Sequence, residues 1–198
     1  MTRIVLGFLS VLAVLIFPLA PVASQEAASE DPAHAAFLDR ASEASLSLDD
    51  VGSGWQTNYH YTFFSEPAGL VISDALFSSP GDQLTYLYNT VFVGESAAVD
   101  QAYALLWTTF ARSGESVVDG PPIGTDWAWI GPKLDAAPPT PASRTEKPFL
   151  TVDFGVMFEA PGGVGTVVLR GEPERFTQAD VVPLALMVAE RLGWAPDE

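Results

Sequence analysis

One segment has the residue types of a catalytic motif: Gly94–Ala98, which reads Gly-Glu-Ser-Ala-Ala. It joins an expected strand to an expected helix, where a nucleophile elbow of the form G-x-S-x-G places its serine. Such a serine needs a histidine base later in the chain, whereas His34 and His60 both precede Ser96. We therefore interpret Ser96 as a helix cap and not as a nucleophile.

Carboxylates are the other groups in this chain that suit catalysis. Asp153 and Glu159 share one face of an expected strand, which we take to face solvent, and two carboxylates can serve as the acid and base of a glycosidase. An acidic surface also brings carboxylates together by chance, so a small carboxylate-dependent hydrolase stays an alternative.

Metal ligands are scarce in this sequence. The chain contains 0 cysteines and 2 histidines, which excludes thiolate zinc sites and leaves few ligands for transition metals. Asp49 and Asp50 are not followed by the spaced acidic loop of a calcium site. We expect no metal and no cofactor.

Aromatic side chains are the better candidates for binding. Several tyrosines and tryptophans recur at two-residue spacing, which places each such pair on one face of a strand. Most should be buried in the core, but any that stay exposed would suit a pocket or a partner surface. The candidate ligand- or partner-binding residues are Trp55, Tyr59, Tyr61, Tyr86, Tyr88, Trp127 and Trp129.

The charge balance restricts the partners. The chain has 9 basic and 25 acidic residues and a net charge of -16, which argues against nucleic acid and against anionic membrane surfaces. A hydrophobic content of 48% indicates a globular protein. The remaining partners are an unidentified protein or a small apolar ligand.

Residues 1–24 have the features of a secretory signal peptide. Arg3 supplies the positive charge, Ile4–Phe17 is apolar but short for a transmembrane helix, and Ala23 and Ser24 offer a small-residue cleavage site. We expect a secreted or extracytoplasmic protein, in the periplasm or outside the cell, with no membrane span after cleavage. Retention of this segment as an anchor is the alternative.

The periodicity of the remaining chain predicts a tether with a short helix at 25–45 and a single domain at 46–198. Adjacent strands joined by a hairpin predict an antiparallel sheet, and amphipathic helices should cover one of its faces, giving an α+β fold. Five prolines within 131–148 predict a mobile exposed loop. Helices are expected at 33–46, 97–112 and 177–192, and strands at 59–64, 84–93, 126–130, 150–159 and 164–170.

Three segments, Leu46–Trp55, Asn89–Ala98 and Pro122–Trp129, resemble exported actinobacterial domains of the LpqN and PknH-sensor type and, more remotely, the PsbP family. The first is similar to an L-D-D-L-P-x-G-W opening and the second to a strand followed by a small-residue helix. The resemblance covers most of residues 46–193. It implies an α/β/α sandwich and a non-enzymatic binding or sensing role at the cell envelope, but no shared site residues.

Overall fold

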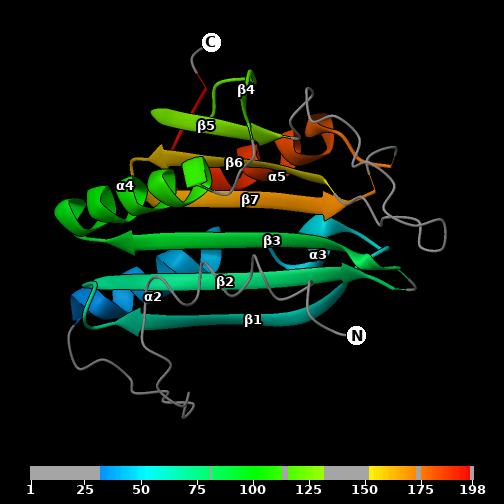
Figure 1. Cartoon of the computed structure of the whole chain (residues 1–198). Helices are drawn as coiled ribbons and strands as arrows, with labels where there is room; N and C mark the ends of the chain where they lie inside the picture. Colours follow the sequence, from blue (N-terminus) through cyan, green and yellow to red (C-terminus); the bar gives the residue numbers. More distant parts are fainter. Residues whose placement is uncertain (1–31, 81, 113–115, 132–151, 173–174, 197–198) are drawn as a thin grey trace.

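The computed structural model describes residues 32–80, 82–112, 116–131, 152–172 and 175–196. The expected signal peptide and nearly all of the proline-rich segment lie outside them. The described strands form one seven-stranded antiparallel sheet in the order β1-β2-β3-β7-β6-β5-β4 (Figure 1). The strands are β1 (Gln56–Ser65), β2 (Leu70–Ser79), β3 (Asp82–Gly94), β4 (Ser116–Val118), β5 (Asp126–Gly131), β6 (Val152–Ala160) and β7 (Gly163–Gly171).

Helices lie on both faces of this sheet. The expectation that they cover one face only is wrong: α2 (Pro32–Ala44), α3 (Leu48–Val51) and α5 (Gln178–Arg191) lie behind the sheet in Figure 1, and α4 (Ser96–Arg112) lies in front. The reason is that central strands such as β7 are buried on both sides. A strand that is apolar on both faces needs cover on both. The predicted fold class is confirmed as an α+β antiparallel sheet covered by amphipathic helices.

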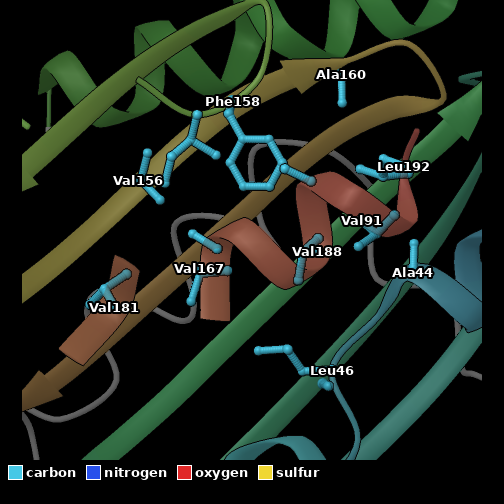
Figure 2. Packing of buried hydrophobic residues seen from close by; sticks show 14 of the residues in the cluster. Ala44, Leu46, Val91, Val156, Phe158, Ala160, Val167, Val181, Val188 and Leu192 are labelled. Carbon is cyan, nitrogen blue, oxygen red and sulfur yellow. The ribbon is translucent and has the colours of Figure 1, made fainter. Parts of the chain in front are cut away.

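The core behind the sheet joins the central strands to α2 and α5. In Figure 2, Val156, Phe158 and Val167 of the sheet lie against Val181 and Val188 of α5. All five side chains are fully buried. Burying a side chain of this size contributes roughly 1.5–3 kcal/mol, so this interface is a main source of stability.

The core in front of the sheet is smaller and lies beneath α4. Leu106 of α4 and Met157 of β6 are among its most deeply buried members. The α4 helix contacts chiefly β3, β7 and β6, and in Figure 1 it does not extend over β1. Among the helices that the structure describes, none therefore covers this end of the front face.

The front core corrects one expectation about the carboxylates. Asp153 of β6 does not face solvent: it is 6% exposed, and Nε of Arg170 donates a hydrogen bond of 2.6 Å to its Oδ1 atom. The second oxygen accepts from Nη2 of the same guanidinium. Alternate residues of β6 point to the front and to the back of the sheet, and both of these faces are covered. The alternation therefore does not mark a solvent-exposed face.

Asn89 ties the chain after α2 to the middle of the sheet. Its side chain is fully buried on β3. The Oδ1 atom accepts hydrogen bonds from the backbone N–H of Leu46 (2.8 Å) and the hydroxyl of Ser45 (3.0 Å), and Nδ2 donates to the carbonyl of Thr166 (2.9 Å). One side chain thus satisfies three groups from two other segments.

An ion pair also joins two helices behind the sheet. The Arg191 guanidinium at the end of α5 donates to both oxygens of Asp50, at 2.9 and 2.7 Å, and to the carbonyl of Ser45. These hydrogen bonds are the main reason that the pKa of Asp50 falls to about 2, although partial burial acts against them. The start of α5 carries the predicted capping box, in which Asp180 accepts from the backbone and hydroxyl of Thr177.

Replacing Asn89 tests this buried anchor. We expect Asn89→Leu to lower the free energy of unfolding by about 2–4 kcal/mol, because the buried Leu46 N–H and Ser45 hydroxyl would each lose their acceptor. Urea denaturation followed by circular dichroism measures the change. The matched control is Asn58→Leu on β1, where the exposed side chain accepts one hydrogen bond, from the Ser78 hydroxyl. This variant should change the free energy of unfolding by about 1 kcal/mol or less; equal losses at both positions would contradict the anchoring role.

Candidate functional site

A carboxylate lies on the front face midway along β2, the second strand from one edge of the sheet. Asp74 is in β2, and the strand register places it directly opposite Tyr61 of β1 and Thr90 of β3. Because side chains alternate along a strand, Tyr59 of β1 and Tyr88 of β3 lie on the same face, one position along. We call Asp74, Tyr59, Tyr61, Tyr88 and Thr90 the tyrosine–aspartate cluster.

Hydrogen bonds hold the carboxylate loosely. The Tyr88 hydroxyl donates to Oδ1 of Asp74 at 3.1 Å, and the Tyr61 hydroxyl donates to Oδ2 at 3.4 Å. Both exceed the usual 2.5–2.7 Å of a hydroxyl donating to a carboxylate. The Thr90 hydroxyl is buried and affects the pKa of Asp74, yet it makes no hydrogen bond of good geometry. The cluster therefore retains hydrogen-bonding capacity for a further group.

Burial has the largest effect on the pKa values of the ionisable side chains in the cluster. Burial raises the pKa of Asp74 above its usual value, although the hydroxyls of Thr90, Tyr88 and Tyr61 act in the opposite direction. Burial, reinforced by the negative charge of Asp74, raises the pKa of Tyr61 to about 12 and also raises the pKa values of Tyr59 and Tyr88. The phenols are therefore neutral donors at physiological pH.

An apolar groove lies beside the cluster, between α4 and the sheet. Its volume is about 200 Å³. The floor comes from β2, β3 and the turn between β1 and β2, and α4 forms one wall. The lining residues used below are Ile72 and Phe92 on the sheet and Ala98, Gln101 and Leu105 on α4.

The groove and the cluster are continuous along the strands. Ile72 lines the groove and Asp74 is the next residue on the same face of β2, about 7 Å further along. On β3, Phe92 of the groove is followed on the same face by Thr90 and then by Tyr88. The front face thus presents an apolar slot that ends in a carboxylate with hydroxyl donors.

The structure brings together three of the seven sequence-predicted binding residues. Tyr59, Tyr61 and Tyr88 belong to the cluster, and Tyr86 follows Tyr88 on the same face of β3, opposite Arg170. The tryptophans lie on the other side of the sheet. Trp55 packs against the back core, Trp129 is buried there with its indole N–H donating to the Pro121 carbonyl (2.8 Å), and Trp127 is 39% exposed beside it.

No sequence pattern identifies Asp74 as a candidate site residue. It belongs to no motif, and the sequence pattern predicts no strand at the position of β2. The available clue is a single carboxylate within the apolar run Leu70–Phe77, because a charged side chain is costly in a buried strand unless it has partners or a function. Identification of those partners required the pairing of β1, β2 and β3.

The serine of the elbow-like segment lacks a base in the structure. Ser96 begins α4 in front of the sheet, while His34 stacks on Phe64 behind it, with ring centroids 4.1 Å apart. His60 alternates with Tyr59 and Tyr61 and so also belongs to the back face. Ser96 is the first residue of α4, so the N-cap position falls to Glu95, whose carbonyl accepts the first intrahelical hydrogen bonds from the N–H groups of Ala98 and Val99.

The comparisons with known proteins give one structural neighbour. The chain is similar to the extracellular domain of PknH from Mycobacterium tuberculosis, with a TM-score of 0.47, 15% sequence identity, and coverage of 79% of this chain and 96% of that domain. No family model matches the chain, and no curated protein is significantly similar to it. The PknH domain is one of the protein types named by the sequence resemblance, and the resemblance to LpqN and PsbP stays a prediction.

Two absences among the described residues bear on the site. Within residues 32–196, apart from the gaps named above, no helix is long and apolar enough to cross a membrane. In the same part of the chain, no group of three or more His, Cys, Asp or Glu side chains is placed to hold a metal ion.

Neutralising Asp74 should stabilise the protein. A folded-state pKa above the unfolded value means that the protonated carboxyl stabilises the fold at low pH, and that this stabilisation is lost as the pH rises through the folded pKa. We expect Asp74→Asn to raise the melting temperature at pH 7 by at least about 2 °C, and the gain to vanish near pH 3. Thermal denaturation at both pH values measures it.

The matched control for this stability test is Asp153→Asn. Asp153 is paired with Arg170, so its neutralisation should lower the melting temperature at pH 7. A loss of stability for Asp74→Asn as large as that for Asp153→Asn would show that Asp74 is a structural carboxylate.

Proposed function

We propose that the protein is a non-catalytic, extracytoplasmic binding module that takes a small, largely apolar ligand on the front face of its sheet. The observation that carries this proposal is the continuity between the apolar groove under α4 and the tyrosine–aspartate cluster. Small-molecule sites characteristically combine apolar walls with a few convergent polar groups.

The energetics of Asp74 support a binding role. Residues that cost stability in the empty protein concentrate at functional sites, where a ligand supplies the missing interactions. Asp74 is withdrawn from water, its two phenol hydrogen bonds are long, and the Thr90 hydroxyl next to it lacks a well-formed bond. A ligand with a complementary polar group would provide hydrogen bonds to Asp74, to the two phenols and to the Thr90 hydroxyl together.

A carboxylate-dependent hydrolase, the alternative raised by the sequence, receives less support from this geometry. Acid–base pairs in glycosidases lie about 5–9.5 Å apart. The carboxylates on the front face of β6, Asp153 and Glu159, are three strand positions away from Asp74, or about 14 Å. Within β1, β2 and residues 85–94 of β3, Asp74 is the one carboxylate.

The groove also supports a small ligand in preference to a bulky one. Its 200 Å³ lies below the roughly 300–1,000 Å³ of sites for drug-sized molecules. A single alkyl chain or a small ring system suits this volume. A carrier of a small apolar ligand is therefore the specific form of binding module that we favour.

The extracytoplasmic location is part of the proposal and comes from the sequence. The signal-peptide features of residues 1–24 support export, and the acidic, cysteine-free composition is compatible with a protein whose fold relies on its apolar cores.

Filling the groove tests the binding function. N-phenyl-1-naphthylamine is a neutral apolar dye whose fluorescence rises in an apolar site, so titration with it should give saturable binding to the wild-type protein. Ala98→Leu places a larger side chain in the groove. Overfilling costs about 1–3 kcal/mol, so we expect the Kd for the dye to rise about tenfold.

The adjacent residue on α4 provides the control. Ala97 is exposed and does not line the groove, so Ala97→Leu should leave the Kd within about a factor of two. Circular dichroism of both variants checks that α4 is intact. Equal effects of the two substitutions, or no saturable binding by the wild type, would contradict the proposed site.

A further inference from the structure

We propose that the ligand is an amphipathic monocation, with an ammonium group that binds at Asp74 and an apolar chain that lies in the groove beneath α4. This inference rests on the binding function proposed above and names the chemical class of the ligand. It is argued from three features of the front face: an uncompensated negative charge, the aromatic rings beside it, and the path from the cluster to the groove.

The first feature is a carboxylate without a cationic partner. Within the described part of the chain, the groups that act on Asp74 are the hydroxyls of Thr90, Tyr88 and Tyr61, with no basic side chain among them. Two other carboxylates that are withdrawn from water have arginine partners: Arg170 for Asp153 and Arg191 for Asp50. A partly buried carboxylate of this kind gains most from a ligand that brings the missing positive charge.

The hydrogen-bonding groups around Asp74 fit an ammonium better than an anion. An ammonium supplies three N–H donors and no acceptor. The oxygens of Asp74 and the unbonded Thr90 hydroxyl provide acceptor positions for them. An anionic head would face the charge of Asp74 directly, without a described basic side chain to offset the repulsion.

Aromatic rings line the approach to the carboxylate. Tyr59, Tyr61 and Phe63 follow one another along the front face of β1, with ring centroids 5.2 and 5.7 Å apart. Tyr61 and Phe63 remain 48% and 38% exposed. A cation within about 6 Å of such a ring face is attracted by its electron density, so these rings favour a cationic ligand.

The third feature sets the shape of the ligand. The head at Asp74 and the groove at Ile72 are one same-face step apart on β2, about 7 Å. A linear chain attached to the ammonium therefore reaches the groove directly and buries its methylenes against Phe92 and the α4 wall. The positive charge also complements the net charge of -16 on the protein, which raises the association rate of cations.

Three probes of equal chain length and different head charge test the inference: octylamine, octan-1-ol and octanoate, measured by isothermal titration calorimetry at pH 7 below their micelle concentrations. We expect octylamine to bind at least about tenfold more tightly than octan-1-ol, and octanoate to bind most weakly. In Asp74→Asn the preference for octylamine over octan-1-ol should disappear, while the affinity for octan-1-ol stays within about threefold.

The control for general charge attraction is Asp100→Asn on α4. This residue is exposed, and its neutralisation changes the net charge by the same amount as Asp74→Asn. The preference for octylamine should persist in this variant and at raised salt. Loss of the preference in both variants would assign it to the overall negative charge and would overturn the inference.

The outcomes also separate this inference from the proposed function. Equal binding of octan-1-ol and octylamine would overturn the cation preference but leave an apolar-ligand carrier. Tightest binding of octanoate would overturn it in favour of a protonated Asp74 that donates to a carboxylate. Absence of binding by all three probes, together with no saturable binding of N-phenyl-1-naphthylamine, would overturn both.

Discussion

The apolar character of the central strands on both of their faces is the constraint on which the rest of this structure depends. The β2, β3 and β7 strands are buried almost throughout their length, so the sheet is stable only with a cover on each side. Behind the sheet, α2 and α5 supply a wide cover (Figure 2). In front, α4 does so chiefly over β3, β7 and β6. The groove and the tyrosine–aspartate cluster lie where this narrower cover ends.

This asymmetry separates stability from binding. The back core, the Asn89 anchor and the Asp50–Arg191 ion pair hold the fold together without contributing to the front face. The front face can therefore carry a carboxylate that is withdrawn from water, together with a Thr90 hydroxyl that lacks a well-formed hydrogen bond. The stability that these groups cost does not prevent the protein from folding. In a binding protein such a cost is offset only when the ligand is present.

The local elements were largely predictable, because each follows from a short-range pattern. Alternation gave the strand at 150–159, and the Thr177–Asp180 capping box marked the start of α5. The turn between β6 and β7 is also local, because Gly163 has φ +154°, a backbone conformation that favours glycine. Two-residue spacing likewise placed Tyr59 with Tyr61, and Tyr86 with Tyr88, on shared faces.

The cluster was not predictable, because it depends on long-range pairing. The β2 strand, Leu70–Ser79, lacks the polar alternation of a half-buried strand, so it gives no strand period that distinguishes it from other apolar runs. Without β2, Tyr61 and Tyr88 have no common neighbour. The solvent-facing interpretation of Asp153 was wrong for a related reason: the second cover, α4, comes from a distant segment.

The most direct test of this account is to map where a ligand binds. Nuclear magnetic resonance spectra of the methyl and aromatic groups, recorded during titration with octylamine, report each part of the surface separately. The account predicts shift changes concentrated at Ile72, Leu105 and Tyr88, on the front face beside α4. Changes concentrated instead at Trp127 or Val117, far from Asp74 in the strand order, would contradict the central claim that the uncovered end of the front face is the binding site.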